Sequence, residues 1–512
     1  MIPPSASSLS TANASPIPST GMALATSRRK LLFIAQCGLL IVTVLFLIHQ
    51  FRSTKPSFSL PSKAHHIGFS INQNGSSFND DADDWVPPSR AGRFDRARTL
   101  MPSILDPDNR SVSRMQCPPI NATRYGYLRP LFITERPCKY VFVLNLRQTV
   151  NLLPRLLGSV IEAIRFLGPA HCALSIVEGN SVDGTLEVLR LLEEPLVELG
   201  VPYWLVSSPL NPKKGDRIRK LAILRALAVE PVTGPPPSSL RDVKTLDEDG
   251  GTEKKKPNTY WALPKHNITD LRPLLAPDAA VLLINDVSAC AEDFLELEHQ
   301  RLVQRADMTC AMDWAHGKDG KDFFYDVWIA RGLDGDIFFD VPPESVSWAR
   351  AVNLFPHEPV ARARMDVGKP FQVFACWNGA AVFAAAPLTT GEVGFRWPTD
   401  GECFQGEVQL FCKDMWWKGH GRIAVVPSVN LQYTDESGRH IKKVKGYVSD
   451  FVQGKRGHHS GAGATKSAVS LQEKITWRGP PDMVKCMPTF SDQRWLPWNE
   501  SLVKMEFPPP VT

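Results

Sequence analysis

A single carboxylate follows an uninterrupted apolar run near the middle of the chain. Residues 280–284 read Ala-Val-Leu-Leu-Ile, and Asn285-Asp286-Val287 follow at once. In an open α/β sheet, ligands bind beyond the carboxyl ends of the strands. A magnesium- or manganese-like ion needs only one or two carboxylates when phosphate oxygens and water complete its shell. The pattern therefore predicts a metal and nucleotide-diphosphate site at Asp286, and the alternative is a helix cap for 288–297.

Two upstream segments carry groups that such a nucleotide needs. Glu178-Gly-Asn-Ser-Val-Asp183-Gly-Thr185 is typical of a sharp turn, in which Asp183 or Thr185 can cap the next helix. Residues 213–220 read Lys-Lys-Gly-Asp-Arg-Ile-Arg-Lys and place Arg217 and Lys220 at a predicted helix start. Cations and free amide groups there suit a diphosphate. The alternatives are structural: a capped turn and a solvated charged face.

Strands alternate with helices around these groups. The apolar patterns predict strands at 140–145, 173–177, 203–207 and 280–284, with helices at 152–164, 186–192 and 217–228 between them. This order predicts an α/β fold whose mainly parallel sheet is covered on both faces. The domain is expected over 131–450. A Pro-, Gly- and charge-rich insertion at 231–258 cannot bury a core.

An N-terminal apolar segment predicts a membrane anchor. Residues 31–48 carry no charge and are just long enough to cross a bilayer as a helix. Arg28, Arg29 and Lys30 precede them and favour a cytosolic tail over 1–30. A cleaved signal peptide is the alternative, but no small-residue cleavage site follows. The polar, Pro- and Ser-rich segment 49–130 is predicted to be a lumenal stem, and 451–512 a flexible segment with a C-terminal tail.

Features beyond the anchor agree with a lumenal, single-pass type II orientation. The chain has ten cysteines, nine of them outside the anchor. These nine can form disulfides in an oxidising lumen, with at least one left unpaired. Burial as small apolar residues is the alternative. A net charge of +5 over 512 residues, without a basic stripe, argues against nucleic-acid binding. Five glycosylation triplets begin at Asn74, Asn109, Asn121, Asn267 and Asn499.

Several longer blocks resemble one enzyme family. They are Ile284-Asn-Asp-Val-Ser-Ala-Cys-Ala-Glu-Asp, Ala311-Met-Asp-Trp314, Phe324-Tyr-Asp-Val-Trp-Ile-Ala-Arg331, Phe374-Ala-Cys-Trp-Asn-Gly-Ala380 and Glu402-Cys-Phe-Gln-Gly-Glu-Val-Gln-Leu-Phe-Cys412. Over residues 131–435 the chain resembles the fungal α-1,3-mannosyltransferases and capsule-associated proteins, which are GT-A-like glycosyltransferases with a Rossmann-type sheet. The resemblance implies a Golgi membrane enzyme that uses GDP-mannose and a mannoside acceptor glycan. It also implies a role in capsule or cell-wall polysaccharide synthesis, with other glycosyltransferases as partners.

The metal motif departs from the GT-A pattern, which has acids at its first and third positions. Here Asn285 and Val287 flank the single carboxylate of Asp286, and a valine side chain cannot bind a metal. A Mn²⁺ or Mg²⁺ ion would therefore be held by fewer protein ligands than usual. Asn285 is a weak candidate ligand, and His420 is a candidate ligand from a later part of the sequence. A histidine between two glycines is more typical of a mobile loop.

Transfer from a GDP-α-mannose donor to an α-mannoside would retain configuration. The metal and cations would stabilise the departing diphosphate, whose oxygen can take the acceptor proton. Glu407 and Asp414 lie seven residues apart in a predicted helix and can face the acceptor together; a solvent-facing pair is the alternative. Four polar residues in aromatic-rich segments are candidates for sugar binding, and a structural role is the alternative for each: Asp313, Asp326, Arg331 and Asn378.

Two hypotheses follow from the resemblance. In the first, the chain is an active mannosyltransferase, and Glu178 accepts hydrogen bonds from the N1–H and amino group of guanine. In the second, it is a non-catalytic, lectin-like or scaffolding member of a polysaccharide-assembling complex, because its metal motif is incomplete. Turnover of GDP-mannose with manganese separates the two.

Overall fold

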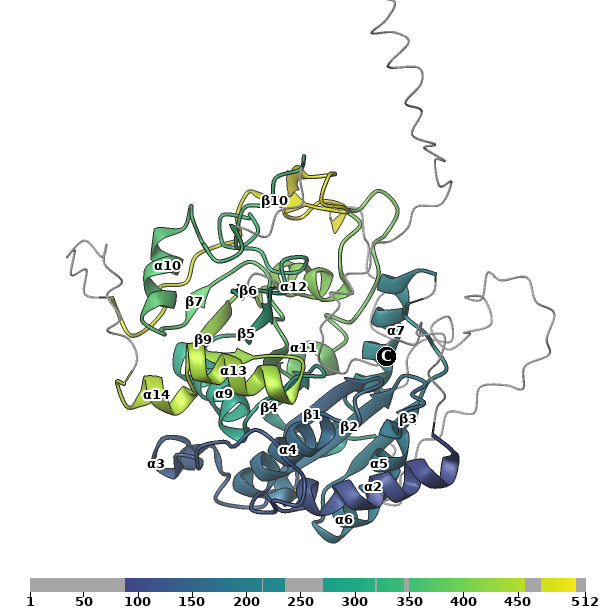
Figure 1. Ribbon diagram of the computed structural model, residues 1–512. Coiled ribbons are helices and arrows are strands. Elements are labelled where there is room, and N and C mark those ends of the chain that lie inside the picture. The colour runs from purple at the N-terminus through teal and green to yellow at the C-terminus, as the bar shows by residue number, and fades with distance from the viewer. Residues whose placement is uncertain are drawn as a thin grey trace, which may run out of the picture. The chain divides into compact units, whose positions relative to one another are not determined.

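The computed structural model (Figure 1) describes residues 88–213, 215–234, 270–317, 320–344, 350–455 and 471–502. The predicted cytosolic tail at 1–30, the predicted anchor at 31–48, Asn74 and Asn267 lie outside these residues. Within the described ranges, no helix is both long and apolar enough to cross a membrane.

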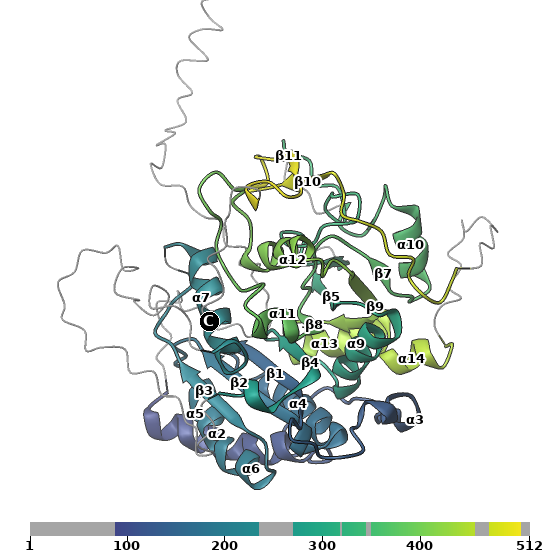
Figure 2. The same ribbon diagram turned by 180° about the vertical axis from the view of Figure 1, so that it is seen from behind.

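One large mixed sheet organises the described chain. Its order is β3-β2-β1-β4-β8-β5-β9-β7, with β6 paired to β5. Figure 2 shows β3, β2, β1 and β4 side by side, and these four are parallel. β8 runs antiparallel to both β4 and β5, and β5 is parallel to β9. The bounds are β1 Cys138–Leu146, β2 Cys172–Glu178, β3 Tyr203–Ser207, β4 Leu275–Ile284, β5 Met308–His316, β6 Asp322–Phe324, β7 Phe371–Gln372, β8 Ala380–Ala384 and β9 Ile423–Leu431.

Helices cover both faces of this sheet, which confirms the predicted mixed α/β fold with a mainly parallel sheet. Successive side chains of β1 point to opposite faces: Phe142 lies in one apolar cluster and Val143 in the other. Helices α4 (Leu153–Leu167) and α9 (Ala291–Gln304) bury residues in the Phe142 cluster. Helices α7 (Arg217–Thr233) and α12 (Glu407–Trp417) bury theirs in the Val143 cluster.

The segment before residue 131 is folded onto this domain, from residue 88 onward. Helix α2 (Arg90–Leu105) packs against α4 and α5 (Thr185–Leu191). The Tyr125 hydroxyl, at the end of α3 (Ala122–Tyr125), donates a 2.8 Å hydrogen bond to Glu296 in α9. The predicted stem boundary at residue 130 is therefore too late. Composition misled the prediction, because this segment is held by polar contacts and scattered apolar side chains.

The C-terminal segment returns to the domain. Strands β10 (Met483–Cys486) and β11 (Arg494–Pro497) form a hairpin. Residues 231–233, predicted to start the insertion, continue α7 instead, with Pro231 inside the helix. The remaining helices are α6 Glu193–Glu198, α10 Pro359–Asp366, α11 Ala386–Thr389, α13 Asp435–Lys445 and α14 Val448–Val452, with 3-10 turns at Gly126–Leu128, Pro169–His171 and Arg272–Leu274.

Disulfides fix several of these long-range contacts. The bonds are Cys117–Cys290, Cys310–Cys376 and Cys403–Cys486. They join the early segment to α9, β5 to the segment before β8, and the C-terminal hairpin to the loop before α12. The other described cysteines, Cys138, Cys172 and Cys412, are buried thiols. The expectation that some cysteines pair and at least one does not is confirmed.

Candidate active site

The predicted acid lies where the order of the parallel strands reverses. β1 sits between β2 and β4, and Leu144 pairs with Ile284 at the ends of β1 and β4. Asn145 and the Asn285–Asp286 pair therefore follow at the same edge of the sheet. A ligand crevice is expected at such a reversal in open α/β sheets. The Asn145 side-chain oxygen is buried there with no hydrogen-bond partner, which marks a polar group that a ligand can satisfy.

The two neighbours of Asp286 explain why the motif has one acid. The Asn285 side-chain oxygen accepts hydrogen bonds from Trp377 (3.3 Å) and Arg225 (3.5 Å), so both of its lone pairs are engaged. Val287 is fully buried in the apolar core. A Cβ atom added at Gly379 would lie only 3.2 Å from the Val287 side chain. Among these three residues, Asp286 alone is left to face a metal.

A buried ion pair lies beside the acid. Arg225 Nε donates to Glu407 Oε1 at 2.7 Å, and both side chains are less than a tenth exposed. The Arg225 guanidinium also lies 4.8 Å from the centre of the Trp377 ring, within cation–π range. Its charge opposes the rise in pKa of both Asp286 and Asp326. Arg225 thus connects α7, α12 and both carboxylates.

Two further acids come together from separate elements. Asp313 in β5 and Asp326 after β6 are close enough for the charge of Asp326 to raise the pKa of Asp313. The Tyr433 hydroxyl donates to Asp313. The backbone amide of Asn378 donates to Asp326 at 3.1 Å, and its side-chain amide donates to the Ala311 carbonyl at 2.9 Å. Of the predicted sugar-binding residues, the structure therefore brings together Asp313, Asp326 and Asn378.

All three carboxylates lie in surroundings that disfavour their charge. Burial raises the pKa of Asp286 to about 6 and that of Asp326 to about 6, and it holds the pKa of Asp313 well above its usual range. The same three charges, after burial itself, raise the pKa of Tyr325 to about 12. One oxygen of Asp313 is also buried without a hydrogen-bond partner. A bound cation would stabilise the ionised form of these buried carboxylates.

The loops after the first strands are joined by hydrogen bonds. Glu178 is fully buried at the end of β2. One of its oxygens accepts from the Ser181 amide and the other from the Ser207 hydroxyl at 2.7 Å. The Ser181 hydroxyl accepts from the Gln148 amide at 2.9 Å, so the loop after β1 is held as well. The structure thus gives the Glu178 carboxylate a turn-stabilising role, the alternative raised for this segment.

The other predicted nucleotide ligands divide into buried and exposed groups. Asp183 accepts from the Thr185 amide and hydroxyl and from the Val150 amide, so it stabilises the turn, whereas the N-cap residue of α5 is Gly184 and neither predicted residue caps the helix. Lys220 is buried in α7, whereas Arg217 opens the helix and is exposed. The charge of Arg217 opposes the rise in pKa of Asp286, so its guanidinium lies near the acid. Arg217 is the better placed of the two cations for a diphosphate.

Three predicted residues have other partners. Both Asp414 oxygens accept from Arg396, at 2.7 and 2.8 Å, so Asp414 and Glu407 do not act as a pair. Arg331 is 1% exposed and donates to carbonyls of its own loop and to that of Lys485, which anchors the C-terminal hairpin. His420 pairs with Glu392 at 3.0 Å, and no contact between described residues links it to Asp286.

Four residues of the site were not predicted: Arg225, Tyr325, Trp377 and Tyr433. Arg225 lies in the middle of a predicted helix, where a charge is usually solvated. Tyr325 and Trp377 lie in segments whose aromatic content was noted, but which ring faces the site depends on tertiary packing. Tyr433 is brought to Asp313 by the pairing of β9 with β5, which has no local signal.

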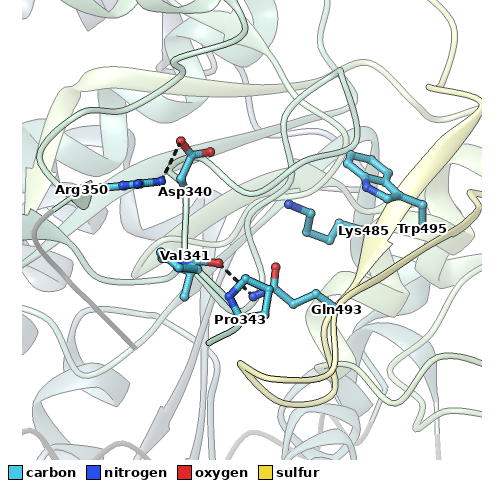
Figure 3. Close-up of a pocket in the computed structure, with 8 residues that line it drawn as sticks. Asp340, Val341, Pro343, Arg350, Lys485, Gln493 and Trp495 are labelled. Carbon is cyan, nitrogen blue, oxygen red and sulfur yellow. Dashed lines mark hydrogen bonds and ion pairs between the residues drawn. The ribbon is translucent and has the colours of Figure 1, made fainter. Parts of the chain in front are cut away.

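A separate hollow lies between the loop at 340–343 and the β10–β11 hairpin (Figure 3). Its volume is about 350 Å³. Figure 3 shows Asp340 paired with Arg350, and Gln493 donating to the Val341 carbonyl at 3.0 Å. The Lys485 ammonium covers one face of the Trp495 ring at 5.2 Å and pairs with Asp336. These contacts hold the hairpin to the domain.

Comparison with known proteins identifies the class of this fold and site. A family model described as cryptococcal mannosyltransferase 1 matches residues 139–414. The α-1,3-mannosyltransferase CMT1 of Cryptococcus neoformans var. neoformans serotype D is 30% identical over 424 residues, which is 78% of this chain and 78% of that protein. The chain belongs to the cryptococcal mannosyltransferase family. It is an enzyme of the glycosyltransferase class.

Solved structures give a weaker likeness. The Staphylococcus aureus TarS structure of residues 1–349 is 11% identical, with a TM-score of 0.29, and the match covers 60% of this chain and 64% of that one. A second TarS structure is 12% identical, with a TM-score of 0.30, over 58% of this chain and 36% of that one. These scores are too low to bear on function.

The partly buried charge of Asp286 predicts a pH-dependent gain in stability when it is removed. With a folded pKa of about 6 against an ordinary value of 3.8, the folded protein holds this proton more tightly than the unfolded chain. The ionised side chain therefore destabilises the fold increasingly as pH rises from about 4 to 6, and fully above 6. Because Asp286 is only half-buried, we expect Asp286→Asn to raise the free energy of unfolding at pH 7 by about 1–3 kcal/mol.

Urea denaturation at pH 4 and pH 7 measures this effect. The two proteins should converge at pH 4. Asp366→Asn, an exposed acid paired with Arg362 at 3.2 Å, serves as the control and should show no such gain. A variant less stable than the wild type at pH 7 would contradict the assigned environment.

Proposed function

We propose that this enzyme transfers mannose from GDP-mannose to a mannose-containing acceptor, forming an α-1,3 linkage with retention of configuration on a GT-A-like fold. The proposal is supported by membership of the family and by the activity in the name of its relative. The observation that carries it is the placement of Asp286 beside the Arg225–Glu407 pair at the reversal of the parallel strands. That crevice suits a nucleotide diphosphate.

A divalent cation, Mn²⁺ or Mg²⁺, fits the residues present. Asp286, Asp313 and Asp326 have raised pKa values although arginines lie near Asp286 and Asp326, and one Asp313 oxygen has no hydrogen-bond partner. Asp286 would hold the ion together with diphosphate oxygens and water. When bound, the ion would neutralise charge on the departing diphosphate. Asn285 and His420 already have protein partners, which leaves Asp286 as the principal ligand.

Arginine side chains of the chain would help the metal to stabilise the negative charge of the diphosphate. Arg217 is exposed in the first turn of α7, where the helix N-terminus also favours negative charge. Arg225 is fixed by Glu407 and Trp377, so its charge is oriented before any ligand binds. Preorganised charge of this kind stabilises a developing anion without reorganisation during the reaction. The leaving oxygen then takes the acceptor proton, which removes the need for a separate base.

The acceptor would lie on the β5, β6 and β8 side of the acid. There Asp326 is positioned by the Asn378 amide, and Asp313 by Tyr433. Tyr325 and Tyr433 pack with ring centres 4.8 Å apart beside these carboxylates. Carboxylates that bind sugar hydroxyls next to aromatic rings provide both hydrogen bonding and apolar stacking. We propose this group as the mannoside subsite, with Glu407 between it and Arg225.

We further propose a single-pass Golgi protein with its catalytic domain in the lumen, acting in polysaccharide synthesis with partner glycosyltransferases. Three disulfides are typical of an oxidising compartment. The predicted anchor at 31–48 supplies the membrane attachment.

Transfer activity should depend on both metal and Asp286. With the full chain in detergent, we expect labelled mannose to pass from GDP-mannose to an α-mannoside, to stop with chelator, and to resume with Mn²⁺. Asp286→Asn should lose about 100-fold or more, the effect of removing one preorganised electrostatic group, while Asp366→Asn should not. Near-normal turnover in Asp286→Asn, or preference for another nucleotide sugar, would refute the proposal.

Substitution of Glu178 tests how this residue affects donor binding. It acts either through its hydrogen bonds to Ser181 and Ser207 or through a direct contact with the guanine base. Burial raises the pKa of the Glu178 carboxyl more than its hydrogen bonds to Ser181 and Ser207 lower it. Glu178→Gln removes a disfavoured charge and keeps one acceptor oxygen, so we expect little change in stability. Its effect on GDP affinity should not exceed that of Ser207→Ala, which disturbs the same network and keeps the carboxylate. Calorimetry with GDP measures both. A loss of GDP affinity tenfold greater in Glu178→Gln would instead show direct base recognition.

Lumenal orientation predicts N-glycosylation of the described triplets. Asn109, Asn121 and Asn499 are all partly exposed. Endoglycosidase treatment of membranes should increase the mobility of the full chain, and an Asn109→Gln, Asn121→Gln, Asn499→Gln variant should lose at least part of this shift. Protease cleavage of the C-terminal part in sealed vesicles, with no glycosidase shift, would show the opposite orientation.

A further inference from the structure

Two histidines and one aspartate converge outside the candidate active site. His316 ends β5, Asp322 begins β6 directly opposite it, and His440 lies in α13. His316 Nδ1 is 2.9 Å from Asp322 Oδ1, and His440 Nε2 is 3.0 and 2.9 Å from the two Asp322 oxygens. The three ligand atoms all lie within 4.8 Å of one another. None of these three residues was predicted from the sequence.

We infer that His316, Asp322 and His440 form a site for a transition-metal dication of the zinc type. Zinc binds nitrogen and carboxylate oxygen at about 2.0–2.2 Å in tetrahedral geometry, which places ligand atoms roughly 3.3–3.5 Å apart. The observed separations from Asp322 differ from this by only a few tenths of an ångström. The set supplies three protein ligands, and water completes the fourth position because both imidazoles are nearly half exposed.

The ligand types separate this site from the one proposed at Asp286. Imidazole nitrogen suits zinc, copper, nickel and ferrous iron, whereas carboxylate and phosphate oxygens suit magnesium and manganese. No nucleotide is needed to complete the histidine site. The inference therefore does not rest on the proposed function, and either can fail without the other.

A bound ion would join elements that carry the active site. Three residues before His316, β5 carries Asp313; four residues after Asp322, the chain carries Asp326; and Tyr433 precedes α13. Hydrogen bonds through Asp322 already link α13 to the β5–β6 hairpin. A metal would replace those bonds with stronger ones, so its expected role is to hold the acceptor-side residues in place.

The test uses the full chain, stripped of metal with a chelator and then titrated with Zn²⁺ by calorimetry without nucleotide. We expect one equivalent to bind and to raise the melting temperature. His316→Ala, His440→Ala and Asp322→Asn should each weaken Zn²⁺ binding by at least about tenfold, since even the loss of an outer partner costs that much. Replacement by Co²⁺ should give the visible absorption of a tetrahedral site, absent from the variants.

Two histidines elsewhere provide matched controls. His420 pairs with Glu392 and His357 lies 3.5 Å from Asp340, so each is an at least partly exposed histidine beside one acid. His420→Ala, His357→Ala and Asp286→Asn should all keep Zn²⁺ binding. The inference is overturned if the wild type binds no equivalent of Zn²⁺, or if binding survives the His316 and His440 substitutions. Circular dichroism establishes that each variant is folded.

Discussion

The buried contact between Arg225 and Glu407 is the constraint on which the site depends. It joins α7 to α12 on one face of the sheet, and the same guanidinium reaches Asn285 and Trp377. A buried ion pair is not in itself strong evidence of stability, because desolvation offsets the attraction. Removing one partner, however, leaves a buried charge and costs about 3–5 kcal/mol. The pair therefore fixes where α7, α12 and the loop after β4 meet.

The carboxylates around this pair illustrate a conflict between stability and function. Asp286, Asp313 and Asp326 are all held where ionisation is disfavoured. A sequence selected for stability alone would place neutral groups at these positions. The unpaired oxygens of Asn145 and Asp313 add to the cost. Such costs are expected where a ligand later supplies the missing charge and hydrogen bonds.

The sequence predicted the elements better than the site, for a physical reason. Apolar runs such as 140–145 and 280–284 report strands locally, and the structure extends them to β1 and β4. Asp286 was identifiable because it directly follows such a strand. The partners of Glu407 and Asp414, and the Lys485 carbonyl that Arg331 reaches, were not, because they lie far away in the sequence. Burial of both Glu407 and Asp414 excludes the alternative of a solvent-facing pair.

The incomplete metal motif follows from packing rather than from loss of function. Val287 fills the core beneath the turn at Gly379. The φ of 86° at Gly379 disfavours a side chain, and an added Cβ atom would lie in tight contact with Val287 at 3.2 Å. That same turn aims the Asn378 amide at Asp326. A second acid at position 287 would place an unpaired charge in an apolar cluster, at a cost far above that of valine. Because diphosphate oxygens and water can complete the shell of a divalent ion, one acid in the motif is consistent with an active enzyme.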